Sequence, residues 1–209
     1  MHVRRNQPER VRRVGRLSAL IAIGALAAAA CDKDSPAPPT SRVESASGVA
    51  RKVASTESFC DVHTATDNGP MLSFPPLAGT PAPPAQAGHW QWINVWATWC
   101  KPCVDELPRL ARWHDKLVAA GRQVDFGFVS VDENDADVEA FRKAHPGAPA
   151  SARLADPSKQ TAWFTALGLD AGSPIPIHVF VSPTGHIRCA RAGGVREQDY
   201  AAIERLLGE

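Results

Sequence analysis

Residues 96–103, with the sequence WATWCKPC, decide the fold, because a strand ends and a helix begins within them. The preceding run 92–96, WINVW, is apolar and rich in β-branched and aromatic residues, which predicts a buried strand. Apolar residues then recur at steps of three and four, which predicts a helix with one apolar face: Val104, Leu107, Leu110, Ala111, Trp113, Leu117 and Val118. Cys100 and Cys103 therefore stand at the start of that helix.

The position of the two cysteines predicts redox chemistry. Unpaired backbone N–H groups and the positive end of the helix dipole stabilise a thiolate, which is the form that attacks disulfides. Two intervening residues in a helical turn bring the sulfurs of Cys100 and Cys103 close enough to bond. We expect Cys100, nearer the solvent, to be the nucleophile and Cys103 to be the resolving thiol. Pro102 suits the first turn, where its missing N–H would be unpaired in any case.

A Cys-x-x-Cys pair is also half of a structural zinc site, which normally needs four ligands. The other cysteines, Cys31, Cys60 and Cys189, are isolated, and no closely spaced pair of histidines follows. The sequence therefore favours a redox pair and predicts neither a metal nor a cofactor.

Residues 94–103, NVWATWCKPC, followed by Glu106 and Pro108, resemble the thioredoxin-like proteins of the TlpA/ResA type. The resemblance covers roughly residues 70–209. Proteins of this type are thiol–disulfide oxidoreductases of the bacterial cell envelope. The resemblance implies an enzyme that exchanges disulfides through Cys100 and Cys103, with reduction of protein disulfides as the expected direction. Its implied partners are disulfide-bearing proteins and an electron donor in the membrane.

The order of elements predicts an α/β fold. The predicted strands are 71–77, 90–97, 124–131, 151–155, 175–181 and 186–192. The predicted helices are 100–120, bent near Pro108, then 137–144, 158–167 and 196–207. Alternation that ends in a hairpin and a helix is typical of a thioredoxin-like three-layer sandwich with a central mixed sheet.

A second diagnostic segment is 172–181, GSPIPIHVFV. In thioredoxin-like folds a cis-proline faces the cysteine pair, and its neighbouring backbone pairs with the substrate chain. Pro176 matches that proline; the family more often continues Thr-Thr, whereas this chain has Ile177-His178. The alternative is that the prolines only make a loop rigid. On the cis-proline interpretation the substrate-binding residues are Trp99, Lys101, Pro102, Ile175 and Pro176.

Glu106 is the candidate acid/base for Cys103. Thioredoxins proper carry a buried aspartate under the cysteine pair, and the matching residue here is Asn94, which cannot take a proton at physiological pH. Glu106 follows Cys103 by three residues and so lies one helical turn away on the same face. Proteins of the TlpA/ResA type have a glutamate associated with this role. The alternative is a solvated carboxylate on the helix surface.

Cys60 and Cys189 are candidates for a structural disulfide, since leftover cysteines in an oxidising compartment usually pair. The bond would tie the start of the domain to the terminal hairpin. Free thiols, or one thiol in an intermolecular bond, are the alternatives.

The N-terminus has the form of a bacterial secretory signal. Six arginines precede the uncharged stretch 17–30, which is shorter than the roughly 20 residues of a membrane-spanning helix. Cys31 directly follows a run of alanines that ends in Ala28-Ala29-Ala30, so residues 1–30 predict a lipoprotein signal with Cys31 lipidated. Ordinary cleavage after an alanine is the alternative. Residues 31–57, rich in Pro, Ser and Ala, predict a disordered tether, and 58–209 the folded domain. The expected location is the periplasmic side of a membrane.

Charge excludes nucleic acid as a partner. The chain has 23 basic and 22 acidic residues; past residue 30 there are 17 basic against 21 acidic, and no basic stripe remains. We expect a monomer. Two other functions stay open at this point. A peroxidase of the peroxiredoxin type would need a Pro-x-x-x-Thr pattern before its cysteine and a distant resolving partner. A copper-binding module would use Cys100, Cys103 and His178, although such relatives space their cysteines CxxxC.

Overall fold

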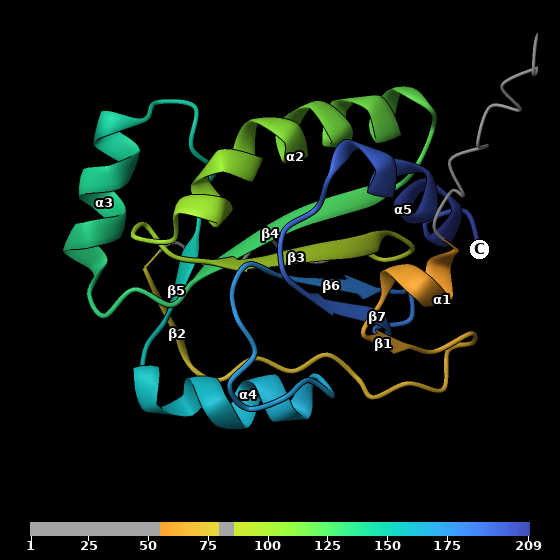
Figure 1. Ribbon diagram of the computed structural model, residues 1–209, viewed down its shortest axis with the longest axis horizontal. Coiled ribbons are helices and arrows are strands. Elements are labelled where there is room, and N and C mark those ends of the chain that lie inside the picture. The colour runs from red at the N-terminus through yellow and green to blue at the C-terminus, as the bar shows by residue number, and fades with distance from the viewer. Residues whose placement is uncertain (1–54, 80–85) are drawn as a thin grey trace, which may run out of the picture. The chain divides into compact units, whose positions relative to one another are not determined.

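The computed structural model describes residues 55–79 and 86–209 (Figure 1). The expected signal segment 1–30, the lipidation candidate Cys31 and the tether as far as residue 54 lie outside the described residues. Helix α1 (Thr56–Phe59) is the first described element, so regular structure begins two residues before the expected start of the domain at residue 58.

Seven strands of the described residues form one mixed sheet in the order β1-β7-β6-β3-β4-β5-β2. Their bounds are Val62–His63 (β1), Leu77–Gly79 (β2), Trp90–Trp96 (β3), Val124–Ser130 (β4), Ala152–Leu154 (β5), Ile177–Val181 (β6) and Ile187–Ala192 (β7). Strand β3 pairs parallel with β4 and antiparallel with β6. Because helices cover both faces of the sheet, β3 is apolar on both of its sides, and Trp92, Val95 and Trp96 are fully buried.

The helices form the two outer layers (Figure 1). Helices α2 (Lys101–Ala119) and α5 (Tyr200–Leu206) lie over one face of the sheet, and α4 (Gln160–Ala166) lies over the other. Helix α3 (Asp135–Ala144) stands beside the N-terminal half of α2. Short 3₁₀ turns, Pro157–Lys159 and Glu197–Asp199, lead into α4 and α5. The predicted three-layer sandwich with a terminal hairpin and C-terminal helix is confirmed.

The first part of the domain differs from the prediction. Residues 71–77 do not form a strand: Met71 makes a single bridge to His186, and strand β2 begins only at Leu77, where it pairs with β5. Pro75 and Pro76 explain the difference, because neither has the N–H that a continuous ladder of hydrogen bonds requires. Strand β1 was not predicted because two residues are too few to show a periodicity.

A disulfide fastens this first part to the sheet. Cys60 and Cys189 are bonded, with Cα atoms 5.5 Å apart, and Cys189 is fully buried in β7. Next to the bond, β1 pairs antiparallel with β7, and the carboxylate of Asp61 accepts the N–H of Ala192 at 2.8 Å. The N-terminal residues thus add an edge strand to the thioredoxin-like sheet.

In the part of the chain that the structure describes, no helix is both long and apolar enough to cross a bilayer.

Removing the Cys60–Cys189 bond should destabilise the domain without unfolding it. The bond spans 129 residues, so opening it restores much conformational freedom to the unfolded chain. We expect Cys60→Ala/Cys189→Ala to lower the free energy of unfolding by about 2–5 kcal/mol, measured by urea denaturation of the oxidised proteins. As a control, reduction of a Cys100→Ser/Cys103→Ser variant should have a similar effect. Equal stability of the double alanine variant and the wild type would contradict the structural role.

Candidate active site

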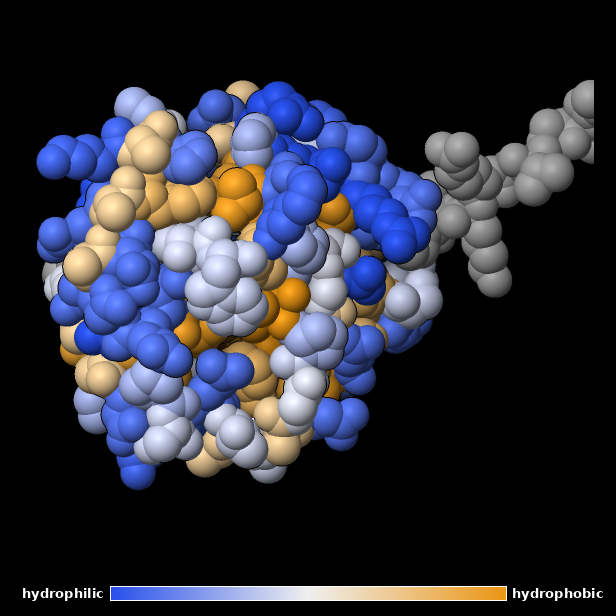
Figure 2. Space-filling view, turned by 60° about the vertical axis from the view of Figure 1, so that its left-hand side comes forward, coloured by the Kyte–Doolittle hydropathy of each residue, from blue (hydrophilic) through white to orange (hydrophobic). Residues whose placement is uncertain are grey.

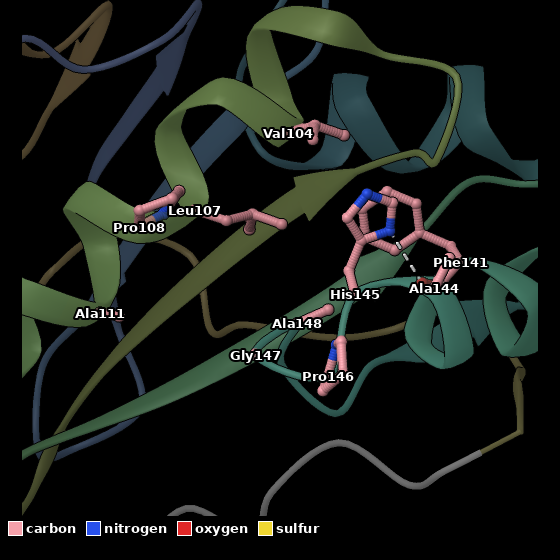
Figure 3. Close-up of a pocket in the computed structure, with 10 residues that line it drawn as sticks. All are labelled: Val104, Leu107, Pro108, Ala111, Phe141, Ala144, His145, Pro146, Gly147 and Ala148. Atoms are coloured by element: carbon pink, nitrogen blue, oxygen red, sulfur yellow. Dashed lines mark hydrogen bonds between the residues drawn. The ribbon is translucent and has the colours of Figure 1, made fainter. Parts of the chain in front are cut away.

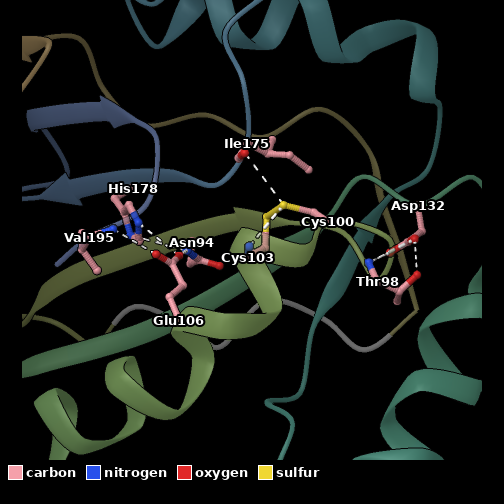
Figure 4. The surroundings of a disulfide bond; sticks show 9 residues. All are labelled: Asn94, Thr98, Cys100, Cys103, Glu106, Asp132, Ile175, His178 and Val195. Carbon is pink, nitrogen blue, oxygen red and sulfur yellow. Dashed lines mark hydrogen bonds and ion pairs between the residues drawn. A yellow bond between two sulfur atoms is a disulfide. The ribbon is translucent and has the colours of Figure 1, made fainter.

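The cysteine pair forms the first turn of α2 (Figure 4). Cys100 is the N-cap residue, and its sulfur accepts the backbone N–H of Cys103 at 3.3 Å. The sulfurs are bonded to each other, with Cα atoms 5.3 Å apart. Cys100 is 5% exposed and Cys103 is fully buried, so Cys100 is the sulfur that an incoming group reaches. Nineteen helical residues follow, so the helix dipole and the free N–H groups of its first turn face this pair.

Lys101 follows Cys100 in sequence, but its ammonium group is paired with a carboxylate and not with the sulfur. Its Nζ atom bonds the carboxylate of Asp105 one turn along α2, at 2.6 Å, and both side chains are exposed. Exposed pairs of this kind contribute little, and the carboxylate offsets the positive field at the sulfur. Lys101 is therefore a surface residue at the rim of the site.

The proline segment faces the cysteine pair. The Ile175–Pro176 peptide bond is cis, and the carbonyl oxygen of Ile175 lies 3.8 Å from the Cys100 sulfur. Gly193 donates its N–H to the carbonyl of Pro176 at 2.8 Å, which holds the segment from behind. Ile175 also lines a hollow beside Cys100, so a polypeptide that enters the hollow would lie against this segment.

That hollow has a volume of about 430 Å³ and opens beside Cys100. Four of the five expected substrate-binding residues line it, and Pro176 follows directly behind Ile175; the lining residues are Trp99, Cys100, Lys101, Pro102, Gln160, Ser173, Pro174 and Ile175. Trp99 is 67% exposed. A large apolar ring in water beside a reactive sulfur is suited to contact a polypeptide.

A second, more apolar hollow lies on the other side of α2 (Figure 3). It has a volume of about 500 Å³ and separates the first half of α2 from α3 and the loop after it; its lining includes Val104, Leu107, Phe141, His145 and Pro146. In Figure 2 apolar residues gather in the middle of this side of the molecule, with polar residues around them. None of the lining residues is one of the two cysteines.

Glu106 is buried, not solvated. Its side chain is 2% exposed, and donors face both of its oxygens: the Asn94 amide donates to Oε1 at 3.0 Å, and the backbone N–H of Val195 donates to Oε2 at 3.0 Å (Figure 4). His178 Nε2 lies 3.2 Å from Oε1, although its N–H is not well aligned for a hydrogen bond. Glu106 is one turn along α2 from Cys103, and its carboxyl group points toward Asn94, His178 and Val195 (Figure 4).

Gly194 is a residue of this site that the sequence analysis missed. A Cβ atom on Gly194 would stand 3.1 Å from Glu106 Oε2 and 3.8 Å from the ring of Pro176. Glycine therefore lets the loop after β7 approach close enough for Val195 to bond the carboxylate. The Gly193-Gly194 pair is the signal that was available in the sequence.

Asp132 is the other missed residue. It is 1% exposed and follows β4, where it accepts the backbone N–H and the hydroxyl of Thr98 at 3.0 and 2.7 Å and the hydroxyl of Ser130 (Figure 4). These bonds fix the turn between β3 and Cys100. A single acidic residue after a strand is too common to predict such a role.

The copper interpretation does not fit His178. Its Nδ1 accepts the indole N–H of Trp92 at 3.1 Å, and its Nε2 faces Glu106, so neither ring nitrogen is free toward the sulfurs. Within residues 55–79 and 86–209, no three His, Cys, Asp or Glu residues are grouped in a way that could hold a metal ion.

The comparisons with known proteins place this site within a family. The AhpC/TSA family matches residues 72–190, more than half of the chain, and the match includes the cysteine pair, Glu106 and the cis-proline. The chain belongs to the AhpC/TSA family. The match runs from the segment before β2 into β7, so it contains the whole of strands β2 to β6.

Individual proteins share only part of their length or a low sequence identity with this chain. Thioredoxin-like protein YneN of Bacillus subtilis is 35% identical over 49 residues, which are 23% of this chain and 29% of that protein. The thioredoxin domain of a thiol-disulfide oxidoreductase from Bacteroides vulgatus has a TM-score of 0.48 at 15% identity, covering 66% of this chain and 98% of that one. A thioredoxin-related protein from Neisseria meningitidis serogroup B has a TM-score of 0.47 at 24% identity, covering 59% and 87%.

Replacing Asp132 should loosen the turn that carries the cysteines. In Asp132→Asn one acceptor oxygen becomes an NH₂ group that faces the donors of Thr98 or Ser130. We expect the free energy of unfolding to fall by about 1–3 kcal/mol, measured by urea denaturation. Asp170→Asn, at an exposed position, is the matched control and should change stability by less than about 0.5 kcal/mol. Equal effects of the two substitutions would show that Asp132 does not hold the turn.

Proposed function

We propose that this protein is a thiol–disulfide oxidoreductase of the thioredoxin type that acts on protein disulfides. One observation carries the proposal: the Cys100–Cys103 pair caps a long helix while the Cys100 sulfur lies 3.8 Å from the Ile175 carbonyl, beside an open hollow. A substrate chain that pairs with the backbone of Ile175 would bring its own sulfur to Cys100.

In the reducing direction, the reduced protein and a substrate disulfide are the only reactants that the exchange needs. The Cys100 thiolate attacks one sulfur of a substrate disulfide, which forms a mixed disulfide and releases one substrate thiolate. Cys103 then gives up its proton and attacks the Cys100 sulfur, which closes the Cys100–Cys103 bond and releases the second thiolate. The dithiol loses two electrons and the substrate disulfide gains them, and the two thiol protons end on the substrate. The structure holds the oxidised form of this cycle.

Within that cycle, Glu106 is the proposed acceptor of the Cys103 proton. The carboxyl group is buried one turn from Cys103, and Asn94, which occupies the position of the thioredoxin aspartate, donates to it instead of accepting a proton. Water is largely excluded at this depth, so a neighbouring side chain is the available acceptor.

The finer assignment is a reductase of the TlpA/ResA type held at a bacterial membrane. Its support is the likeness of residues 94–103, Glu106 and Pro108 to that type, and the lipoprotein-like segment that ends at Cys31. Lipid on Cys31 and a tether up to the folded domain would let a monomer receive electrons from a membrane donor and pass them to exported proteins. The name of the Bacillus relative, a thioredoxin-like protein, agrees with this proposal over the 49 matched residues.

Two single cysteine variants test the exchange. Cys103→Ser should form a long-lived mixed disulfide with a peptide disulfide, because the resolving thiol is absent, whereas Cys100→Ser should form none. Intact mass spectrometry measures both, and insulin reduction measures the loss of turnover in each variant. Consumption of peroxide by the reduced wild type with no disulfide exchange would favour a peroxidase and overturn the proposal. Equilibration with glutathione gives the direction: a potential below about −250 mV indicates a reductant and one near −120 mV an oxidant.

Glu106→Gln tests the proton acceptor. The amide keeps the size of the side chain but cannot take a proton at neutral pH, so we expect single-turnover reduction of a peptide disulfide to slow by about 10–100-fold at pH 6–7. Glu139→Gln, an exposed substitution on α3, is the matched control and should leave the rate unchanged. A Glu106→Gln variant that matches wild type across pH 6–8 would remove Glu106 from the mechanism.

A further inference from the structure

His178 is a buried ionisable residue that the exchange steps do not use. It is the second residue of β6, whose five residues are all buried, and it is fully inaccessible to solvent. An apolar side chain would suit that position, and a buried imidazole must instead find polar partners. Strand register supplies them: His178 is paired directly with Asn94 of β3, and Trp92 lies two residues before Asn94 on the same face.

Trp92 fixes the tautomer of His178. An indole N–H can only donate, and Trp92 Nε1 lies 3.1 Å from His178 Nδ1, so Nδ1 must carry the lone pair. The Asn94 amide, 3.4 Å from the same nitrogen, also presents its NH₂ group there. A proton on Nδ1 would face both donors. In the neutral ring the proton therefore sits on Nε2, 3.2 Å from Glu106 Oε1.

With His178 in this tautomer, three polar groups around Glu106 turn an N–H toward its carboxyl group. The Asn94 amide and His178 Nε2 face Oε1, and the Val195 backbone N–H faces Oε2. Two of these groups, the Asn94 amide and the Val195 N–H, make hydrogen bonds to the carboxyl group, and the His178 N–H lies near Oε1 without bonding it. Because a carboxyl group has about four acceptor sites, two bonds leave room on it for a proton.

We infer that His178 is a positioning residue: Trp92 holds it in the Nε2–H tautomer, so that the ring turns its N–H, and not a lone pair, toward Glu106, the proposed acceptor of the Cys103 proton. This inference rests on the proposed function and deepens it. In this arrangement Glu106 is the base, Cys103 is the nucleophile that it serves, and His178 is the third group that orients the base.

The proton balance follows from the exchange steps. Cys103 gives its proton to Glu106 as its sulfur attacks Cys100, and no electron passes through the carboxyl group. The proton then passes to the departing substrate thiolate or to solvent, which restores the carboxylate. His178 keeps its own proton throughout.

The groups that face Glu106 come from each element packed against it. Cys103 lies one turn back on α2, His178 is on β6 and Asn94 is on β3. On the fourth side is the loop of Val195, whose carbonyl accepts from the guanidinium of Arg109 at 2.7 Å. Of these, Cys103 and His178 have ionisable side chains, and the Arg109 guanidinium carries a positive charge.

The test is the pH profile of the resolving step in the full chain. Single-turnover reduction of a peptide disulfide by the reduced protein is followed by tryptophan fluorescence from pH 5 to 9. We expect His178→Leu to move the acidic limb to higher pH, so that the rate at pH 6 falls about tenfold, which corresponds to a shift of about one pH unit. The rate near pH 9 should stay the same, because at that pH a thiol loses its proton to solvent without the help of a base. His178→Gln returns an N–H donor and should move the limb back toward that of the wild type.

Two further measurements keep the inference testable if His178→Leu does not fold. Trp92→Phe keeps an aromatic ring but removes the donor to Nδ1, so the limb should move in the same direction by a smaller amount. Long-range ¹H–¹⁵N spectra of the wild type should show His178 as the Nε2–H tautomer at pH 7. His145→Leu removes an exposed imidazole outside the site and should leave the profile unchanged.

The outcomes separate the two proposals. An unmoved acidic limb in His178→Leu, or in Trp92→Phe where the leucine variant does not fold, overturns the role of His178 and leaves the oxidoreductase standing. A loss of rate that is uniform across pH, or an Nδ1–H tautomer, also overturns it. A wild-type protein that reduces no disulfide overturns the proposed function itself.

Discussion

The hydrogen bond from the backbone N–H of Cys103 to the sulfur of Cys100 is the contact on which the site depends. It makes the sulfur a helix cap, so the atom that is exposed to the unpaired N–H groups of α2 is also the atom that meets the substrate. For the sulfur to reach this position, β3 must end and the helix must begin within four residues. Asp132, which follows β4, fixes that short turn by accepting the backbone N–H and the hydroxyl of Thr98.

The two sulfurs of this turn differ in how exposed they are to solvent. Cys100 lies at the edge of the hollow beside Ile175, whereas Cys103 is one turn in and fully buried against the sheet. In the proposed exchange a substrate sulfur therefore meets Cys100 first, and attack by Cys103 releases it. The burial of Cys103 also keeps water away from it, so the buried carboxyl group of Glu106, one turn along α2, is the proposed proton acceptor.

The sequence predicted the parts whose signal is local. The run WINVW, the apolar periodicity of α2 and the residues of the hairpin predicted the central strands and the helix of the site, and the resemblance named Pro176. It did not predict strand β1, whose two residues depend on pairing with β7 and on Cys189 far along the chain. Nor could it predict the Val195 contact, because a backbone N–H carries no information about residue type. The partners of His178 required the register of β3 and β6, which periodicity alone does not set.

That register explains why a histidine can stand in a strand whose other residues are all apolar. On the face covered by α2, the antiparallel pair of β3 and β6 places Trp92, Asn94 and His178 in one cluster, and Glu106 reaches it from the helix. Each member satisfies a donor or acceptor of another, so no single residue can be exchanged for an apolar one without leaving a buried polar atom alone. The Asn94 carbonyl oxygen, which has no partner among the described residues, shows that the cluster is arranged around donors to Glu106 and not around the amide itself. Two centres therefore set the directions of the hydrogen bonds in the cluster: the carboxyl group of Glu106, which accepts from Asn94 and Val195, and Nδ1 of His178, which accepts from Trp92.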